Sequence, residues 1–233
     1  MKSTYTELKQ QAFEANLEIP RRGLALYTFG NVSAFDAERA VFAIKPSGVP
    51  YESLTAADMV VLDLDCNVVE GRLRPSSDTK THAALYRAPQ FRGIGAIVHT
   101  HSTYATAWAQ ARLPIPLYGT THADHLAEDV PCTAVMTAEA VEKDYEAETG
   151  AQIIACFSAR DPHQTPMVIV GGHGAFAWGK TAEKAVYHAV VLEEIAKIAA
   201  LTETLNSQVG RLPDYLVRKH FERKHGKNAT YGQ

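Results

Sequence analysis

Short apolar runs separated by polar turns fill the first third of the sequence, and they constrain the fold more than any other feature. The segments LALYTFGNVSAFD, VFAIKPSG, MVVLDLD and NVVEG alternate with loops rich in glycine, proline, serine and asparagine, as strands joined by tight turns do. We predict a strand on each side of Gly30–Asn31, and a hairpin that turns at Asp65, Cys66 and Asn67. None of the apolar runs approaches the roughly 18 to 20 residues that a membrane-spanning helix needs.

Helical spacing of the apolar residues appears at the start of the chain and again after Thr79. Leu8, Ala12, Ala15 and Ile19 predict a helix over residues 5–19, which Pro20 should end. The remaining pattern predicts buried strands at 93–102 and at 166–171, the second ending in GGHGAFAWG, helices at 81–90, 103–112 and 181–205, and a charged helix from residue 214. The buried face of the helix at 181–205 is expected at Ala185, Ala189, Leu192, Ala196 and Ala199, and its solvent-facing side at Glu193, Glu194 and Lys197. Asp78 or Thr79 is expected to cap the helix that follows them.

The composition indicates one compact domain that spans residues 1–233. Hydrophobic residues make up 46% of the chain and charged residues 21%, which excludes wholesale disorder. The net charge of −3 is too small to favour nucleic acid or another polyanion as a partner. The three cysteines form no Cys-x-x-Cys pair, and the first residues contain no apolar signal segment. We therefore expect a cytoplasmic protein without a membrane partner.

Three histidines stand at the ends of predicted strands. His99 and His101 are two residues apart, so in an extended chain both side chains point to the same face. His173 closes the second buried strand between glycines, which allow close approach of the backbone. Three imidazoles with an open position would suit a catalytic divalent metal. The alternative is a set of hydrogen-bonded, partly buried histidines.

Polar loops after the strands suggest that the ligand is an anionic small molecule. Small hydroxyl side chains and backbone amides are the groups that hold phosphate oxygens. These loops contain Gly30 and Asn31, Ser47 and Gly48, and Ser76 and Ser77, with Lys45 beside the second. Each loop alone is ordinary turn chemistry.

In their order along the chain, these segments resemble the class II aldolase and epimerase family. The resemblance rests on GNVSAFD, IKPSGVPYESL, PSSDTKTH, IVHTHSTYATAWAQ, GTTHADH, YEAETG, GGHGAFAWGK and KHGKNATYGQ. It implies an α/β fold of three layers, with a central, mainly antiparallel sheet flanked by helices. It also implies a sugar-phosphate substrate and a cyclic homotetramer whose active sites lie between neighbouring subunits.

The resemblance also assigns roles to single residues. It implies one divalent metal per subunit, usually zinc, with manganese or cobalt as alternatives. The implied metal residues are His99, His101, His173 and Asp78. The implied substrate residues are Gly30, Asn31, Lys45, Ser47, Gly48, Ser76 and Ser77. Asp124 and Tyr231 match the pair that moves protons from the neighbouring subunit, and Thr120, Glu146 and His220 are possible supporting residues.

Asp78 distinguishes two branches of the family. Aldolases that act on fuculose phosphate carry glutamate at this position as a base, whereas the epimerases carry the shorter aspartate. The resemblance therefore favours an epimerase that interconverts L-ribulose 5-phosphate and D-xylulose 5-phosphate by retro-aldol cleavage, rotation of the aldehyde and recombination. An aldolase of the fuculose- or rhamnulose-phosphate type is the alternative. A metal-free scaffold similar to the adducin head is a third interpretation, which the three histidines disfavour.

Overall fold

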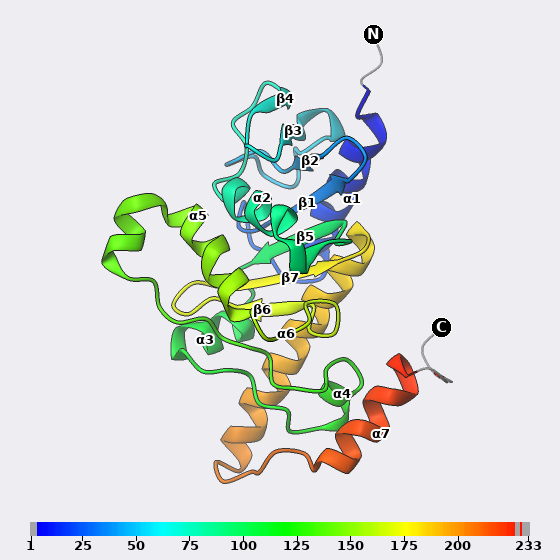
Figure 1. Ribbon diagram of the computed structural model, residues 1–233, viewed down its shortest axis with the longest axis vertical. Helices are drawn as coiled ribbons and strands as arrows, with labels where there is room; N and C mark the ends of the chain where they lie inside the picture. The colour runs from blue at the N-terminus through cyan, green and yellow to red at the C-terminus, as the bar shows by residue number, and fades with distance from the viewer. Residues whose placement is uncertain (1–3, 227–228, 230–233) are drawn as a thin grey trace.

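The computed structural model describes residues 4–226 and 229, and a seven-stranded antiparallel sheet lies at its centre (Figure 1). The strand order is β4-β3-β2-β1-β5-β7-β6. The strands are β1 (Asn31–Asp36), β2 (Val41–Ile44), β3 (Val60–Asp63), β4 (Val68–Glu70), β5 (Ala96–Thr100), β6 (Met167–Ile169) and β7 (Ala175–Gly179). Every pair of neighbouring strands is antiparallel.

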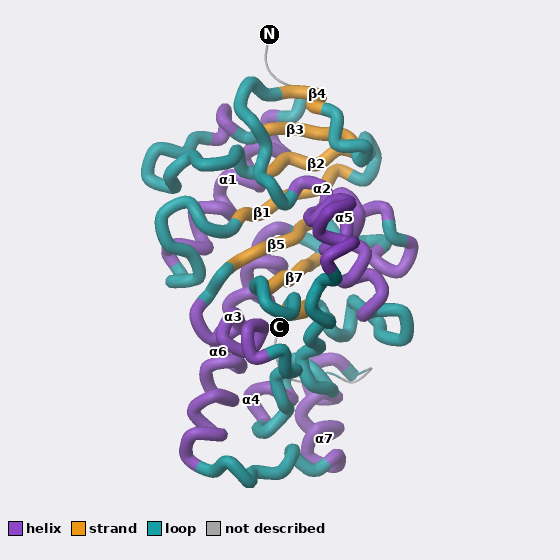
Figure 2. The backbone as a smooth tube through the Cα atoms, turned by 90° about the vertical axis from the view of Figure 1, so that its left-hand side faces the viewer, coloured by secondary structure: helices purple, strands orange, loops and turns teal. Residues whose placement is uncertain are grey.

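Helices cover both faces of the sheet, so the fold has the three layers that we expected (Figures 1 and 2). One face packs against α1 (Thr6–Arg21), α3 (Thr103–Ala111) and α6 (Ala182–Leu205), and the other against α2 (Thr79–Arg87) and α5 (Ala138–Cys156). The short helix α4 (Thr120–Ala123) packs against α7 (Asp214–His225) beyond the end of the sheet. Two short 3-10 turns, Ala56–Asp58 and Pro89–Phe91, complete the elements.

Strand β5, in the interior of the sheet, is buried on both faces. Ala96 and Val98 belong to the core under α1 and α6, whereas Ile97 belongs to the core under α2 and α5. Alternation of side chains along a strand produces this division. Because β5 lies between β1 and β7 in the sheet, the residues at its end are held by backbone hydrogen bonds from two sides. The position of His99 is fixed by this pairing.

Much of the predicted secondary structure is confirmed. The hairpin β3–β4 turns at Asp65–Asn67, and the predicted apolar stripe of α1 is buried. The buried face of α6 is also as predicted. None of the helices within residues 4–226 is long and apolar enough to cross a membrane.

Several local predictions are wrong. Residues 24–29 form no strand: Phe29 N–H bonds to the Leu26 carbonyl in a turn, and Tyr27 has a φ of 51°. Pro20 lies within the last turn of α1, because a proline removes only its own N–H donor, and the helix continues to Arg21. We did not predict a helix at α5, and β7 is a strand of its own rather than the end of the strand before it.

Two predicted roles of charged residues near helix starts are also corrected. Asp78 occupies the N-cap position of α2, but its carboxylate does not bond to the helix. Glu193, which we expected on the solvent-facing side of α6, accepts hydrogen bonds from the backbone N–H groups of Tyr104 and Ala105 at 2.9 Å each. It therefore caps the first turn of α3 and fastens that helix to α6.

Candidate active site

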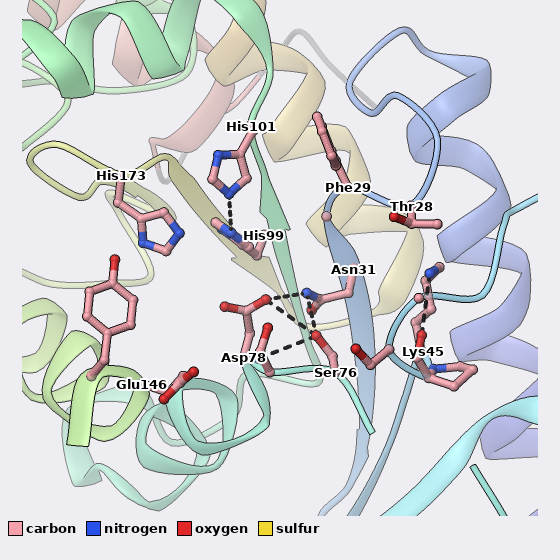
Figure 3. A pocket seen from close by; sticks show the side chains of 16 residues that line it. Thr28, Phe29, Asn31, Lys45, Ser76, Asp78, His99, His101, Glu146 and His173 are labelled. Atoms are coloured by element: carbon pink, nitrogen blue, oxygen red, sulfur yellow. Dashed lines mark hydrogen bonds between the residues drawn. The ribbon is translucent and has the colours of Figure 1, made fainter. Parts of the chain in front are cut away.

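A cavity of about 480 Å³ opens where β1 begins and β5 ends, and it brings together most of the residues that we predicted (Figure 3). The predicted residues that line it are Gly30, Asn31, Lys45, Ser47, Gly48, Ser76, Ser77, Asp78, His99, His101, Glu146 and His173. The three imidazoles occupy one end of the cavity and Lys45 the other, with Asn31, Ser76 and Asp78 between them. Phe29 and Tyr145 also line the cavity, and we did not predict either of them.

His99, His101 and His173 converge as the spacing of the first two predicted. One ring nitrogen from each histidine lies within 4.8 Å of the others. The Nε2 atoms of His99 and His101 are 3.1 Å apart. His173 does not close strand β6 as we expected, because it lies in the turn before β7, where its N–H bonds to the Val170 carbonyl. The pairing of β5 with β7 brings this turn beside His99.

The donor set fits a divalent metal. The Nδ1 atom of His99 lies 3.0 Å from the carbonyl oxygen of Ala175, so Nδ1 carries the proton and Nε2 presents its lone pair to the cavity. The buried Nδ1 atom of His173 has no hydrogen-bond partner among the described residues. Ligand nitrogens around a tetrahedral zinc ion lie about 3.3 Å apart. The separation of 3.1 Å between the Nε2 atoms of His99 and His101 is close to this value.

The charge state of the histidines also suits a metal ligand. Burial lowers the pKa of His173 to about 4, and the neighbouring His99 and His101 lower it further. Burial and His99 lower the pKa of His101 below its usual value as well. At neutral pH both rings are therefore uncharged, as a metal-binding imidazole must be.

Asp78 is held by Asn31 and Ser76 rather than by its own helix. The Nδ2 atom of Asn31 donates to Oδ2 of Asp78 at 2.7 Å and to Oγ of Ser76 at 3.0 Å. Burial acts to raise the pKa of the Asp78 carboxyl, but His99, His82 and the Asn31 hydrogen bond outweigh it, and the pKa lies below its usual value. Asp78 is thus an anion beside the histidines. The Oδ1 atom of Asn31 is buried without a partner among the described residues, which leaves one acceptor for a ligand.

Lys45 is a buried cation at the other end of the cavity. Its residue is 2% exposed, and its Nζ lies 4.8 Å from the centre of the Tyr51 ring and 3.4 Å from the carbonyl of Pro46. No carboxylate within 4 Å of this ammonium is found among the described residues. Burial lowers the pKa of Lys45 to about 8. A buried positive charge without a counter-ion favours binding of an anion.

The loops around Ser47 and Ser76 are tied to each other. The Ser47 N–H bonds to the Arg74 carbonyl at 2.9 Å, and the Ser76 N–H bonds to the Lys45 carbonyl at 3.0 Å. These two amides are therefore not the phosphate donors that we expected from the loops. The serine hydroxyls and the Lys45 ammonium remain at the cavity, and Gly48 turns the first loop with a φ of 71°.

Three predicted residues lie elsewhere in the chain. Thr120 begins α4, and Asp124 follows it and contacts α7. The Asp124 carboxylate accepts hydrogen bonds from Arg223 at 2.9 and 2.6 Å and lies 3.0 Å from Nδ1 of His220. Burial acts to raise the pKa of Asp124, but these partners keep it below its usual value. None of the three lines the histidine cavity, and Tyr231 lies outside the described residues.

The pattern of the whole domain identifies its family. The family described as Class II Aldolase and Adducin N-terminal domain matches residues 10–200 of the chain. The protein therefore belongs to this family. The antiparallel sheet, the two helical layers and the histidine cluster on β5 and the β6–β7 turn are all features of this matched region.

Solved structures of similar proteins include two aldolases. The chain is 29% identical to an L-fuculose 1-phosphate aldolase, with a TM-score of 0.80 over 96% of this chain and 97% of that one. The L-fuculose-1-phosphate aldolase of Thermus thermophilus is 24% identical, with a TM-score of 0.67 over 88% and 98%. YgbL from Klebsiella pneumoniae is 23% identical, with a TM-score of 0.72 over 93% and 99%. The last two share the fold with this chain.

Proposed function

We propose that the protein is a metal-dependent epimerase that interconverts L-ribulose 5-phosphate and D-xylulose 5-phosphate at C4. The observation that carries this proposal is Asp78, a short carboxylate that Asn31 holds between the histidines and the anion-binding end of the cavity. The fuculose-phosphate branch of the family carries glutamate at the matching position, as the base that moves a proton at the enediolate carbon. An epimerase has no use for such a base, because protonation of that carbon would release the fragments.

The two ends of the cavity suit the two ends of a ketose phosphate. The phosphate would lie near the hydroxyls of Ser47 and Ser76 and the unpaired charge of Lys45. The ketone and the C3 hydroxyl would then lie at the histidines, where a divalent metal, zinc in our proposal, would act as a Lewis acid on these oxygens. The Oδ1 atom of Asn31 would accept a hydrogen bond from a substrate hydroxyl.

Cleavage of the C3–C4 bond avoids the difficulty of removing the C4 hydrogen, which is not acidic. When the C4 hydroxyl loses its proton, the C3–C4 electron pair moves to the ketone fragment, and glycolaldehyde phosphate forms beside a dihydroxyacetone enediolate. The phosphate contacts hold the aldehyde while it turns its other face. Recombination forms the bond again with the opposite configuration at C4.

The C4 oxygen loses a proton before cleavage and regains one after recombination on the opposite face. An acid or base group is therefore required on each side of the aldehyde. We propose that Asp124 and Tyr231 of a neighbouring subunit supply them, with Thr120, Glu146 and His220 as supporting groups, in a cyclic homotetramer. Asp124 supports this arrangement because its carboxylate is anionic, lies outside its own histidine cavity and is held in place by Arg223. Because Asp124 does not line the cavity of its own chain, it would act on the site of a neighbouring subunit.

A class II aldolase of the fuculose-phosphate type is the competing function. The structural likeness to an L-fuculose 1-phosphate aldolase, at a TM-score of 0.80, favours it. The two functions differ in their products, so incubation of the zinc-loaded protein with L-ribulose 5-phosphate separates them. The epimerase produces xylulose 5-phosphate and releases free aldehyde in only a small fraction of its turnovers. Aldehyde that accumulates as fast as substrate disappears would refute the epimerase and support the aldolase.

A metal-free scaffold is the third interpretation, and metal analysis tests it. The convergence of three histidine nitrogens within 4.8 Å speaks against it. Well under one equivalent of metal per chain, with no activity on any sugar phosphate after zinc is added, would favour the scaffold.

A further inference from the structure

We propose that Phe29 and Tyr145 form two aromatic walls that retain the aldehyde fragment between cleavage and recombination. This inference rests on the proposed epimerase function and goes beyond it, since it concerns what happens to the cleaved fragments. Phe29 stands beside His101 and Tyr145 beside His173, both line the cavity, and neither belongs to the cluster of three histidines. Their role is to keep water out and the aldehyde in.

Phe29 stands beside His101 at the mouth of the cavity (Figure 3). The two ring centres are 6.4 Å apart, and Phe29 is 55% exposed. A phenylalanine that exposes half of its surface to water at the edge of a polar cavity loses the favourable burial that its ring would have in a core. An apolar group that occupies the cavity mouth would cover this ring.

The position of Phe29 is fixed by Tyr51. The Tyr51 hydroxyl lies 2.8 Å from the carbonyl of Phe29 and 2.9 Å from that of Gly30, and it donates to both. Gly30 has a φ of 74°, and a Cβ at this position would come within 2.7 Å of the His99 carbonyl. The backbone therefore turns at Gly30 as only glycine allows, and the ring of Phe29 is directed to the cavity by a rigid support.

Tyr145 lines the same cavity beside His173. The ring centres are 5.8 Å apart, and Tyr145 is 37% exposed. It follows a break in α5, because Asp144 has the non-helical angles φ −173° and ψ 94°. Lys80 on α2 forms an ion pair with Asp144. Tyr145 is the first residue after the break. The break at Asp144 and the ion pair with Lys80 therefore hold Tyr145 at the cavity.

The chemistry shows what such walls would prevent. After cleavage, a proton from water at C3 of the enediolate would give dihydroxyacetone, and the hydroxide left behind would be neutralised by the proton released from the C4 hydroxyl. Glycolaldehyde phosphate would then leave as a second product, and the carbon–carbon bond could not form again. The two aromatic walls lower access of water to C3 and of the aldehyde to solvent.

The experiment measures how cleaved substrate divides between recombination and release. Phe29→Ala and Tyr145→Ala are assayed with L-ribulose 5-phosphate in deuterium oxide, and xylulose 5-phosphate, glycolaldehyde phosphate and dihydroxyacetone are quantified. We expect each variant to release roughly ten times more aldehyde per epimerisation than the wild type, since each removes a large apolar surface. The dihydroxyacetone should carry one deuterium at the carbon that was C3. Metal content should stay at the wild-type value.

Two matched controls separate retention from general damage. Leu26→Ala changes an apolar residue of the Phe29 loop that is 68% exposed and does not line the cavity, so it should not alter the product ratio. Tyr145→Phe keeps the ring, so its ratio of released aldehyde to xylulose 5-phosphate should stay near the wild-type ratio. If Phe29→Ala and Tyr145→Ala epimerise with the wild-type ratio of products, the walls do not retain the aldehyde. If the wild type itself releases all of its aldehyde, the proposed function fails instead.

Discussion

Asn31 and Asp78 are 47 positions apart in the sequence, yet the Nδ2 atom of Asn31 donates to Oδ2 of Asp78 at 2.7 Å. Asn31 is the first residue of β1, and Asp78 directly precedes α2. Asp78 occupies the capping position of this helix. Because of this hydrogen bond with Asn31, the Asp78 carboxylate does not cap α2 and lies instead in the cavity with the histidines.

Replacement of Asn31 tests the importance of this contact. Asn31→Ala removes donors to Asp78 and Ser76, and a hydrogen bond to a charged group contributes about 1.5 to 3 kcal/mol. We expect kcat/KM for L-ribulose 5-phosphate to fall about 10- to 150-fold, with metal content unchanged. Asn67→Ala is the control, because Asn67 makes a similar bond to Asp63 in an exposed turn. An equal fall of kcat/KM in Asn31→Ala and Asn67→Ala would show that the Asn31 contact has no special role in the reaction.

Loss of any histidine of the cluster should remove the metal. His101→Asn and His173→Asn each leave two imidazoles, which are too few for a tight three-ligand site. We expect metal per chain, measured by elemental analysis after dialysis, to fall together with activity. His163→Asn is the matched control, since His163 is exposed and lies outside the cluster. Full metal occupancy in an inactive His173→Asn variant would show that His173 is not a ligand.

The residues of the cavity that could be predicted are those with a short-range signal. Two histidines two residues apart on a strand must point to one face, and the structure confirms this for His99 and His101. Turn residues such as Ser47 and Ser76 can be recognised by their chemistry, but the use of their amides to join two loops depends on long-range pairing. The sequence alone contains no pattern for that pairing.

Phe29 and Tyr145 were missed for two different reasons. The run that contains Phe29 has the alternation of a strand, but no neighbouring strand is available to pair with it among the described residues, and it forms a turn instead. Tyr145 becomes part of the cavity only because α5 breaks at Asp144 and packs against α2. In both cases tertiary packing, rather than local preference, decides the conformation.

Acid should destabilise the fold partly through His122. Burial lowers the pKa of His122 to about 4, against 6.5 in an unfolded chain. Above pH 6.5 both states are neutral and His122 has no effect. As the pH falls from 6.5 to 4, only the unfolded state takes up the proton, so stability is lost. At pH 5 this loss amounts to about 2 kcal/mol.

A variant without a titratable side chain at position 122 measures the contribution of His122 to the pH dependence of stability. We expect the free energy of unfolding of His122→Gln to fall about 2 kcal/mol less than that of the wild type between pH 7.5 and pH 5, at one protein concentration. Urea unfolding at the two pH values gives this difference. His163→Gln, which changes an exposed histidine, should follow the wild type. A His122→Gln variant with the wild-type pH dependence would contradict the assignment.

Asp124 provides the test of a site shared between subunits. Its carboxylate bonds to Arg223 and lies outside the cavity of its own chain. Asp124→Asn should therefore retain metal but lose activity by about 100-fold or more, the usual effect of removing a positioned acid or base. Mixed with the metal-deficient variant His173→Asn, it should regain activity, because some interfaces then join an intact cluster to an intact Asp124. Random exchange in a cyclic assembly makes about one quarter of the sites complete. If native mass spectrometry shows that subunits have exchanged and no activity returns, Asp124 does not act on the neighbouring subunit.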